Sequence, residues 1–140
     1  MEFRGKIYEG DLPYIFISYS HLDADRVNPI IRQLQSGGFR VWYDSGIEAG
    51  EEWPAYIAAH LKKCGCFIPF LTANYMRSDN CRQELHYALQ KKRNLLPVYL
   101  EQVELSEGLD MQLSPIQALM YYGSISQKRF MGQLTHAAIM

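Results

Sequence analysis

One glutamate, Glu84, stands at an unusual place in the pattern of a predicted helix. Apolar residues recur there at i, i+4, i+7 and i+8 and predict one buried stripe: Cys81, Leu85, Ala88 and Leu89. Glu84 precedes Leu85 by one residue, about 100° of helical rotation, so it lies at the edge of that stripe. It is either a solvated first-turn glutamate favoured by the helix dipole or a carboxylate held beside the core for a chemical purpose.

The start of this helix is predicted from its capping residues. Asn80 is a plausible N-cap, because its side-chain oxygen can accept a hydrogen bond from an unpaired backbone N–H of the first turn. Gln83 stands three residues later, where a reciprocal capping partner is found. The helix is therefore expected to begin near Asn80, which places Glu84 in its second turn.

Cleavage of an N-glycosidic bond is a reaction that suits a lone glutamate near aromatic side chains. The sugar passes through an oxocarbenium-like cation, which a nearby carboxylate stabilises. The leaving base needs a shielded place, and Trp53, Tyr19 or Phe16 could stack on it. A cationic leaving group such as nicotinamide needs no general acid, so one carboxylate can suffice. This compatibility does not identify the substrate.

Other chemistries find less support in the sequence. Cys81 with His86 nearby suggests a thiol nucleophile, but the apolar stripe favours an inert buried thiol at Cys81. The phosphate loop, the dinucleotide-binding glycine motif and the nucleophile elbow of hydrolases are absent. Neither a disulfide framework nor zinc-ligand spacing is found among the three cysteines. The strand ends that carry acidic residues in phospho-acceptor receivers read Ser18-Tyr19 and Leu71-Thr72 instead.

Composition is that of an ordinary globular domain. The chain has 140 residues, of which 48% are hydrophobic and 21% charged, and its net charge is −1. This balance favours neither a nucleic-acid surface nor an anionic membrane. The N-terminus has no apolar signal core, and no apolar run approaches the ~20 residues of a membrane span. A reduced, cytoplasmic setting is therefore expected.

Short apolar runs alternate with helical patterns along the whole chain. The predicted strands are 14–18, 39–43, 66–71, 95–100 and 116–122. The predicted helices are 23–36, 53–63, the helix carrying Glu84, and 126–140, with connections at 44–52, 72–79 and 101–115. This alternation predicts an α/β fold, a flavodoxin-like five-stranded parallel sheet in the order 2-1-3-4-5 with helices on both faces.

That topology gives the candidate residues a common location. In such sheets ligands bind beyond the carboxyl ends of the strands, at the switch point between strands 1 and 3. The residues expected to converge on this crevice are Ser18, Tyr19, His21, Asp44, Glu48, Trp53 and Glu84.

Four segments, in order, resemble those of Toll/interleukin-1 receptor (TIR) domains. They are Tyr14-Ile-Phe-Ile-Ser-Tyr-Ser20; Phe39-x-Val-Trp-Tyr-Asp44 with Gly50 and Trp53; Phe67-Ile-Pro-Phe-Leu-Thr-x-x-Tyr75-x-x-Ser78-x-x-Cys81-x-x-Glu84-Leu85; and Leu96-Pro97-Val98. The resemblance covers roughly residues 13–134, and it is nearest to the bacterial and plant members that cleave NAD.

The resemblance implies an NAD glycohydrolase that releases nicotinamide and ADP-ribose or a cyclic variant. Glu84 matches the catalytic glutamate, and Trp53 lies near the position of a substrate-stacking aromatic residue. Four residues match the nucleotide crevice: Ser18, Tyr19, Ser20 and His21. The predicted substrate-binding set consists of these four together with Phe16, Asp44, Trp53 and Cys81. NAD would be the substrate, and no separate cofactor is expected.

One departure concerns the stacking residue. Several NAD-cleaving relatives have tryptophan four residues before the glutamate, where this chain has Asn80. Trp53 is expected to supply the missing ring, with Trp42 as the other candidate.

The resemblance also implies how such a domain works in a larger system. Residues 1–140 are expected to form a single TIR domain with an N-terminal extension at 1–12. The last helix has no C-cap glycine, which suggests a module taken from a longer chain. Relatives often act when oligomerised, through TIR–TIR contacts, and in bacterial antiphage defence they are fused to a sensor such as a cyclic-dinucleotide receptor. The alternatives are a non-enzymatic scaffold and a decoy that binds host TIR proteins.

Overall fold

The described part of the chain is built around a parallel sheet in the order β2-β1-β3-β4-β5, as predicted. The computed structural model describes residues 8–43, 53–121 and 127–137. Its strands are β1 (Ile15–Ser18), β2 (Val41–Tyr43), β3 (Cys66–Leu71), β4 (Val98–Tyr99) and β5 (Leu119–Met120). Its helices are the 3₁₀ turn η1 (His21–Asp23), α1 (Ala24–Ser36), α2 (Trp53–Lys63), α3 (Ala73–Arg77), α4 (Asp79–Gln90), α5 (Glu107–Leu113) and α6 (Gln127–Ala137).

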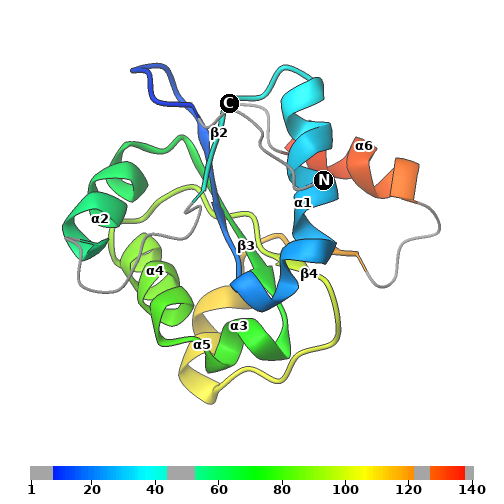
Figure 1. Cartoon of the computed structure of the whole chain (residues 1–140). Coiled ribbons are helices and arrows are strands. Elements are labelled where there is room, and N and C mark those ends of the chain that lie inside the picture. Colours follow the sequence, from blue (N-terminus) through cyan, green and yellow to red (C-terminus); the bar gives the residue numbers. More distant parts are fainter. Residues whose placement is uncertain (1–7, 44–52, 122–126, 138–140) are drawn as a thin grey trace.

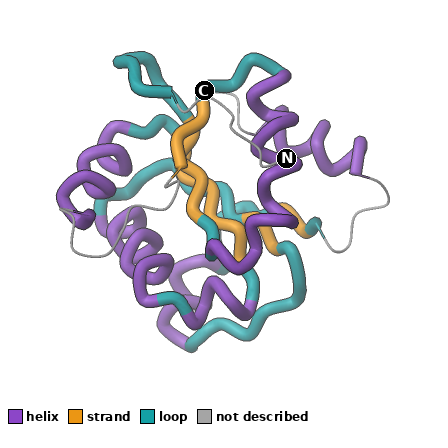
Figure 2. The backbone as a smooth tube through the Cα atoms, viewed as in Figure 1, coloured by secondary structure: helices purple, strands orange, loops and turns teal. Residues whose placement is uncertain are grey.

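Helices cover both faces of the sheet (Figures 1 and 2). Successive strand side chains enter two different hydrophobic cores, one on each face. Ile15 and Ile17 of β1 pack with α1 and α6, whereas Phe16 packs with α2, α4 and α5. Because successive side chains of a strand point to opposite faces, Ser18 follows Phe16 toward the α4 side. This alternation brings a polar side chain of the central strand to the helix that carries Glu84.

Several predicted elements differ from the structure. The second and fifth strands are shorter than the predicted 39–43 and 116–122, at Val41–Tyr43 and Leu119–Met120. The 72–79 connection contains a short helix, α3, because Thr72 caps it by accepting a hydrogen bond from the backbone N–H of Tyr75 at 3.0 Å. The 101–115 connection contains α5, capped by Ser106. The fourth strand shrinks to Val98–Tyr99, where Pro97 interrupts the hydrogen bonding because it has no N–H to donate.

The helix with Glu84 begins earlier than predicted. Ser78, not Asn80, is the N-cap: its hydroxyl accepts a hydrogen bond from the backbone N–H of Cys81 at 3.2 Å. Ser78 has the extended backbone that an N-cap requires, whereas Asn80 already lies within α4. Glu84 is thus one turn and a half into the helix, and it faces inward.

In the described residues, none of the helices combines the length and apolar character needed to cross a bilayer.

Candidate active site

Glu84 and Ser18 form a direct hydrogen bond at the carboxyl end of β1. The Ser18 hydroxyl donates to Glu84 Oε1 at 2.6 Å. Both residues are buried, with Ser18 1% exposed and Glu84 8% exposed. The structure therefore supports the second reading of Glu84: it is not a solvated first-turn residue but a carboxylate held against the central strand.

Tyr75 of α3 extends this contact into a chain of hydroxyl groups. Its phenol oxygen lies 2.8 Å from Ser18 Oγ, and its side chain is fully buried. Because the single Ser18 hydroxyl proton goes to Glu84, the Tyr75 hydroxyl is the donor to Ser18. Burial, with Cys81 and Glu84 nearby, raises the pKa of Tyr75, so the phenol keeps its proton. The carboxylate oxygen is thus fixed by an ordered Tyr75–Ser18–Glu84 chain.

A cavity of about 310 Å³ opens beside this chain. Its lining comes from the end of β1, from η1, from α3 and from the first half of α4. The lining residues are Ile17, Tyr19, Ser20, His21, Leu22, Asn74, Arg77, Ser78, Asn80, Cys81 and Glu84. The cavity thus lies at the switch point between β1 and β3, where the topology predicts a ligand.

Five of the predicted site residues line this cavity: Tyr19, Ser20, His21, Cys81 and Glu84. Ser18 is not one of the lining residues, but its hydroxyl donates a hydrogen bond to Glu84, which is. Phe16, predicted to stack on a base, is fully buried in the core between Trp42 and Phe67, with ring centroids 5.0 Å and 5.3 Å away. It is therefore out of reach of a ligand in the cavity.

Trp53 and Trp42 are the two tryptophans predicted to stack on a planar base. Trp42 is buried on β2, where its ring stacks on His60 at 4.2 Å and its indole N–H donates to Glu9 at 2.8 Å. It does not line the cavity. Trp53 begins α2, but its side chain, like Asp44 and Glu48, lies outside the described residues. Tyr19 is the predicted stacking residue that the structure places at the cavity.

Several residues that line the cavity were not predicted at the site: Ile17, Leu22, Asn74, Arg77 and Ser78. Leu22 of η1 is 81% exposed at the rim, and Asn74 and Arg77 come from α3. The signal that could have found α3 is Thr72, a capping residue followed by five residues without proline or glycine.

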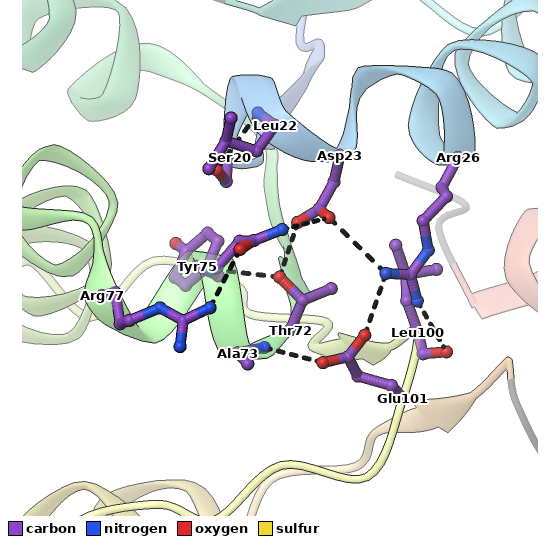
Figure 3. A network of polar contacts seen from close by, with 11 residues as sticks. Ser20, Leu22, Asp23, Arg26, Thr72, Ala73, Tyr75, Arg77, Leu100 and Glu101 are labelled. Atoms are coloured by element: carbon purple, nitrogen blue, oxygen red, sulfur yellow. Dashed lines mark hydrogen bonds and ion pairs between the residues drawn. The ribbon is translucent and has the colours of Figure 1, made fainter.

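A polar network joins the segments that follow β1, β3 and β4 at the same edge of the sheet (Figure 3). Asp23, 2% exposed, accepts hydrogen bonds from Thr72 Oγ1 at 2.6 Å and Asn74 Nδ2 at 2.9 Å, and Arg26 Nη1 lies at 3.5 Å. Arg26 also donates to Glu101 Oε1 at 2.9 Å. This network fixes the start of α3, and with it the cavity wall.

Thiol and metal chemistry gain no support from the described residues. Cys64, Cys66 and Cys81 are buried, and none of them forms a disulfide. Burial, reinforced by Cys66, raises the pKa of Cys64 to about 12, and burial raises the pKa of Cys66 to about 11, so these two thiols stay protonated. Among the residues described, no three His, Cys, Asp or Glu side chains are grouped to hold a metal ion.

Comparison with known proteins identifies the family to which this chain belongs. A family model described as "TIR domain" matches residues 15–134, and the chain belongs to this family. An uncharacterized protein y4lF of Sinorhizobium fredii is 26% identical over 98 residues, which are 64% of this chain and 30% of that protein. The chain therefore spans less than a third of this curated relative.

Solved structures share the fold at low sequence identity. The TIR domain of the Toll-related receptor TRR-2 from Hydra magnipapillata has a TM-score of 0.73 and 15% identity, covering 87% of this chain and 94% of that one. The TIR domains of the activated Roq1 resistosome, which recognises the effector XopQ, have a TM-score of 0.73 and 14% identity. The match covers 91% of this chain and 100% of that one. The Clostridium botulinum CMP N-glycosidase BcmB has a TM-score of 0.64 and 14% identity. The match covers 87% of this chain and 98% of that one.

Proposed function

We propose that this TIR domain is an NAD glycohydrolase that uses Glu84 as its catalytic carboxylate. The observation that carries the proposal is the buried Glu84 carboxylate, anchored by Ser18 and placed on the wall of a cavity at the switch point. A buried carboxylate that opens on a cavity is suited to stabilise a cation formed there. The CMP N-glycosidase of C. botulinum supports the proposal, because a protein of this fold cleaves an N-glycosidic bond.

In the proposed reaction the bond between ribose C1′ and the nicotinamide nitrogen breaks. The bonding electron pair leaves with nicotinamide, which becomes neutral, so no proton donor is needed. Glu84 stabilises the oxocarbenium-like ribose by its negative charge. A water molecule then adds to C1′ and loses one proton, giving ADP-ribose; attack by a nitrogen of the adenine would give a cyclic product instead. NAD is the substrate, and the proposal needs no cofactor.

The proposal includes assembly. Activity is expected when copies associate through TIR–TIR contacts, a state for which the TIR domains of the Roq1 resistosome offer a precedent in this fold. A sensor module, fused or separate, such as a receptor for a cyclic dinucleotide, would trigger assembly, and antiphage defence in the cytoplasm is the proposed setting.

The test is an NAD assay on the protein clustered through a fused oligomerising tag. Nicotinamide and both ADP-ribose products are followed by chromatography for wild type, Glu84→Ala and Glu84→Gln. Both variants are expected to lose about 10²- to 10³-fold in rate, because the charge on the cavity wall is gone. Arg82→Ala is the matched control: Arg82 lies two residues away on α4, pairs with Asp79 at the surface and does not line the cavity.

Unchanged nicotinamide release by Glu84→Ala would exclude the role given to Glu84. The competing function is a scaffold that acts by homotypic TIR association. It predicts concentration-dependent association of wild type with no loss of NAD under any clustering condition.

A further inference from the structure

Arg77, at the end of α3, is the feature of the cavity that the proposed chemistry at Glu84 leaves without a role. Among the described residues that line the cavity, it is the one that carries a permanent positive charge, while Glu84 carries the negative one. The two charged groups come from neighbouring helices, α3 and α4. The cavity therefore has a cationic part as well as an anionic part.

The side chain of Arg77 is anchored to the buried polar network. Arg77 Nη2 donates to Asn74 Oδ1 at 3.2 Å, and Asn74 Nδ2 donates to Asp23 Oδ1 at 2.9 Å. An ionised carboxylate accepts hydrogen bonds only, so Asn74 must turn its nitrogen to Asp23 and its oxygen to Arg77. Figure 3 shows Arg77 on the α3 side of the network, joined to it by this contact. The buried Asp23 thus sets the direction of an exposed guanidinium.

The guanidinium of Arg77 keeps most of its donors available. In the described part of the chain Arg77 has no ion pair at contact distance. Glu101, a carboxylate of the network, accepts hydrogen bonds from the backbone N–H of Ala73 and from Arg26, each at 2.9 Å. Of the five N–H donors of Arg77, one is used by Asn74. The rest present the planar fork that suits a phosphate group.

We propose that Arg77, oriented by Asn74 and Asp23, binds the phosphate of a nucleotide whose N-glycosidic bond lies at Glu84. This inference rests on the proposed function and adds a specificity to it: the site selects nucleotides over the corresponding nucleosides. Arg77 acts on ground-state binding of the phosphate, and Glu84 acts on the sugar cation.

The test compares two ligands that differ by one phosphate, nicotinamide mononucleotide and nicotinamide riboside. Binding to the full chain is measured by calorimetry in a Glu84→Gln background, so that turnover is too slow to disturb the measurement. Adding Arg77→Ala is expected to weaken mononucleotide binding about 10- to 100-fold and to leave riboside binding unchanged, as for loss of a charged hydrogen-bonded contact. Arg77→Lys is expected to retain part of the preference, because it keeps the charge but not the planar fork.

Two further variants separate orientation from charge. Asn74→Ala keeps the guanidinium but removes its anchor, and is expected to weaken mononucleotide binding less than Arg77→Ala does. Arg82→Ala removes an exposed arginine outside the cavity and is expected to leave the binding of both ligands unchanged.

The outcomes also separate this inference from the proposed function. The phosphate role would be overturned if Arg77→Ala weakened the binding of both ligands equally or of neither. It would also be overturned if the Glu84→Gln protein did not bind the mononucleotide. Arg77-dependent selection together with no NAD cleavage by clustered wild type would support the phosphate role and contradict the glycohydrolase. Cleavage of NAD without Arg77-dependent selection would support the glycohydrolase and contradict the phosphate role.

Discussion

Asp23 and Glu84 are two buried carboxylates at the same edge of the sheet, and they have opposite surroundings. Asp23 is 2% exposed and accepts hydrogen bonds from Thr72 and Asn74 at the start of α3 and from Arg26 of α1. It is not among the described residues that line the cavity. Glu84 is 8% exposed, is fixed by Ser18 and forms part of the cavity wall.

This contrast shows that burial alone does not identify a catalytic carboxylate. Burying a charge is costly unless hydrogen bonds and counter-charges compensate for the lost water. At Asp23 the donors of neighbouring loops meet that need, and the result is a fixed start for α3. At Glu84 the carboxylate also faces a cavity, where a ligand can use its charge. Mutation of Asp23 should therefore mainly lower the stability of the fold, whereas mutation of Glu84 should mainly lower activity.

Removing the Asp23 carboxylate should destabilise the fold more than removing that of Glu84. Asp23→Ala leaves the fully buried Thr72 hydroxyl without its acceptor and Arg26 without its buried partner, at an expected cost of about 2–4 kcal/mol in unfolding free energy. Glu84→Ala relieves a buried charge and should cost less. Urea denaturation followed by circular dichroism measures both.

Asp25→Ala is the matched control for Asp23, since Asp25 is exposed in the first turn of α1, two residues away. It should change the unfolding free energy much less. A loss at Glu84 as large as that at Asp23 would contradict the division of roles between the two carboxylates.

A smaller effect is expected from restoring a ring to the cavity wall. Asn80 lines the cavity, is exposed and lies outside the N-cap, so Asn80→Trp should preserve the fold. Stacking on a base is worth about 1–3 kcal/mol, so the KM for NAD should fall by about tenfold with little change in kcat. Steady-state kinetics of nicotinamide release would show this.

Asn80→Leu has an apolar side chain without a ring and serves as the control. If it lowered KM as much as tryptophan, the gain would come from burial of apolar surface and not from stacking. A rise in KM for Asn80→Trp would mean that Asn80 contacts the substrate itself.

The sheet order and most elements were predictable from sequence, because buried parallel strands are short apolar runs and because right-handed crossovers restrict their order. The bounds of β3 and α2 agree with the prediction residue by residue. The position of Glu84 at the carboxyl edge followed from this topology. Its hydrogen bond to Ser18 did not, because the pairing depends on which face of β1 Ser18 occupies.

The errors concern short elements and side chains that act across the fold. Asn80 and Ser78 are both good capping residues, and the choice between them depends on the preceding helix α3, which periodicity cannot detect in five residues. Phe16 was predicted to bind the substrate as a stacking ring, but strand alternation turns it into the core. The Asp23 network joins residues up to 75 positions apart through Arg26 and Glu101, and no local pattern shows it.

The smallest predicted effect concerns Glu101, the exposed end of the network that Asp23 anchors. A hydrogen bond from the backbone N–H of Ala73, then one from Arg26, lowers the pKa of Glu101 below its ordinary value of 4.5. A carboxyl whose pKa is lowered by folding stabilises the protein above its unfolded pKa, and that contribution is lost as the pH falls through the folded value. Glu101→Gln should therefore reduce the unfolding free energy slightly at pH 7, and the difference from wild type should vanish toward pH 3. Denaturation between pH 7 and pH 3 measures this difference, and Glu104→Gln is an exposed control from the same loop. A difference that persists undiminished at low pH would show that Glu101 contributes through packing and not through its charge.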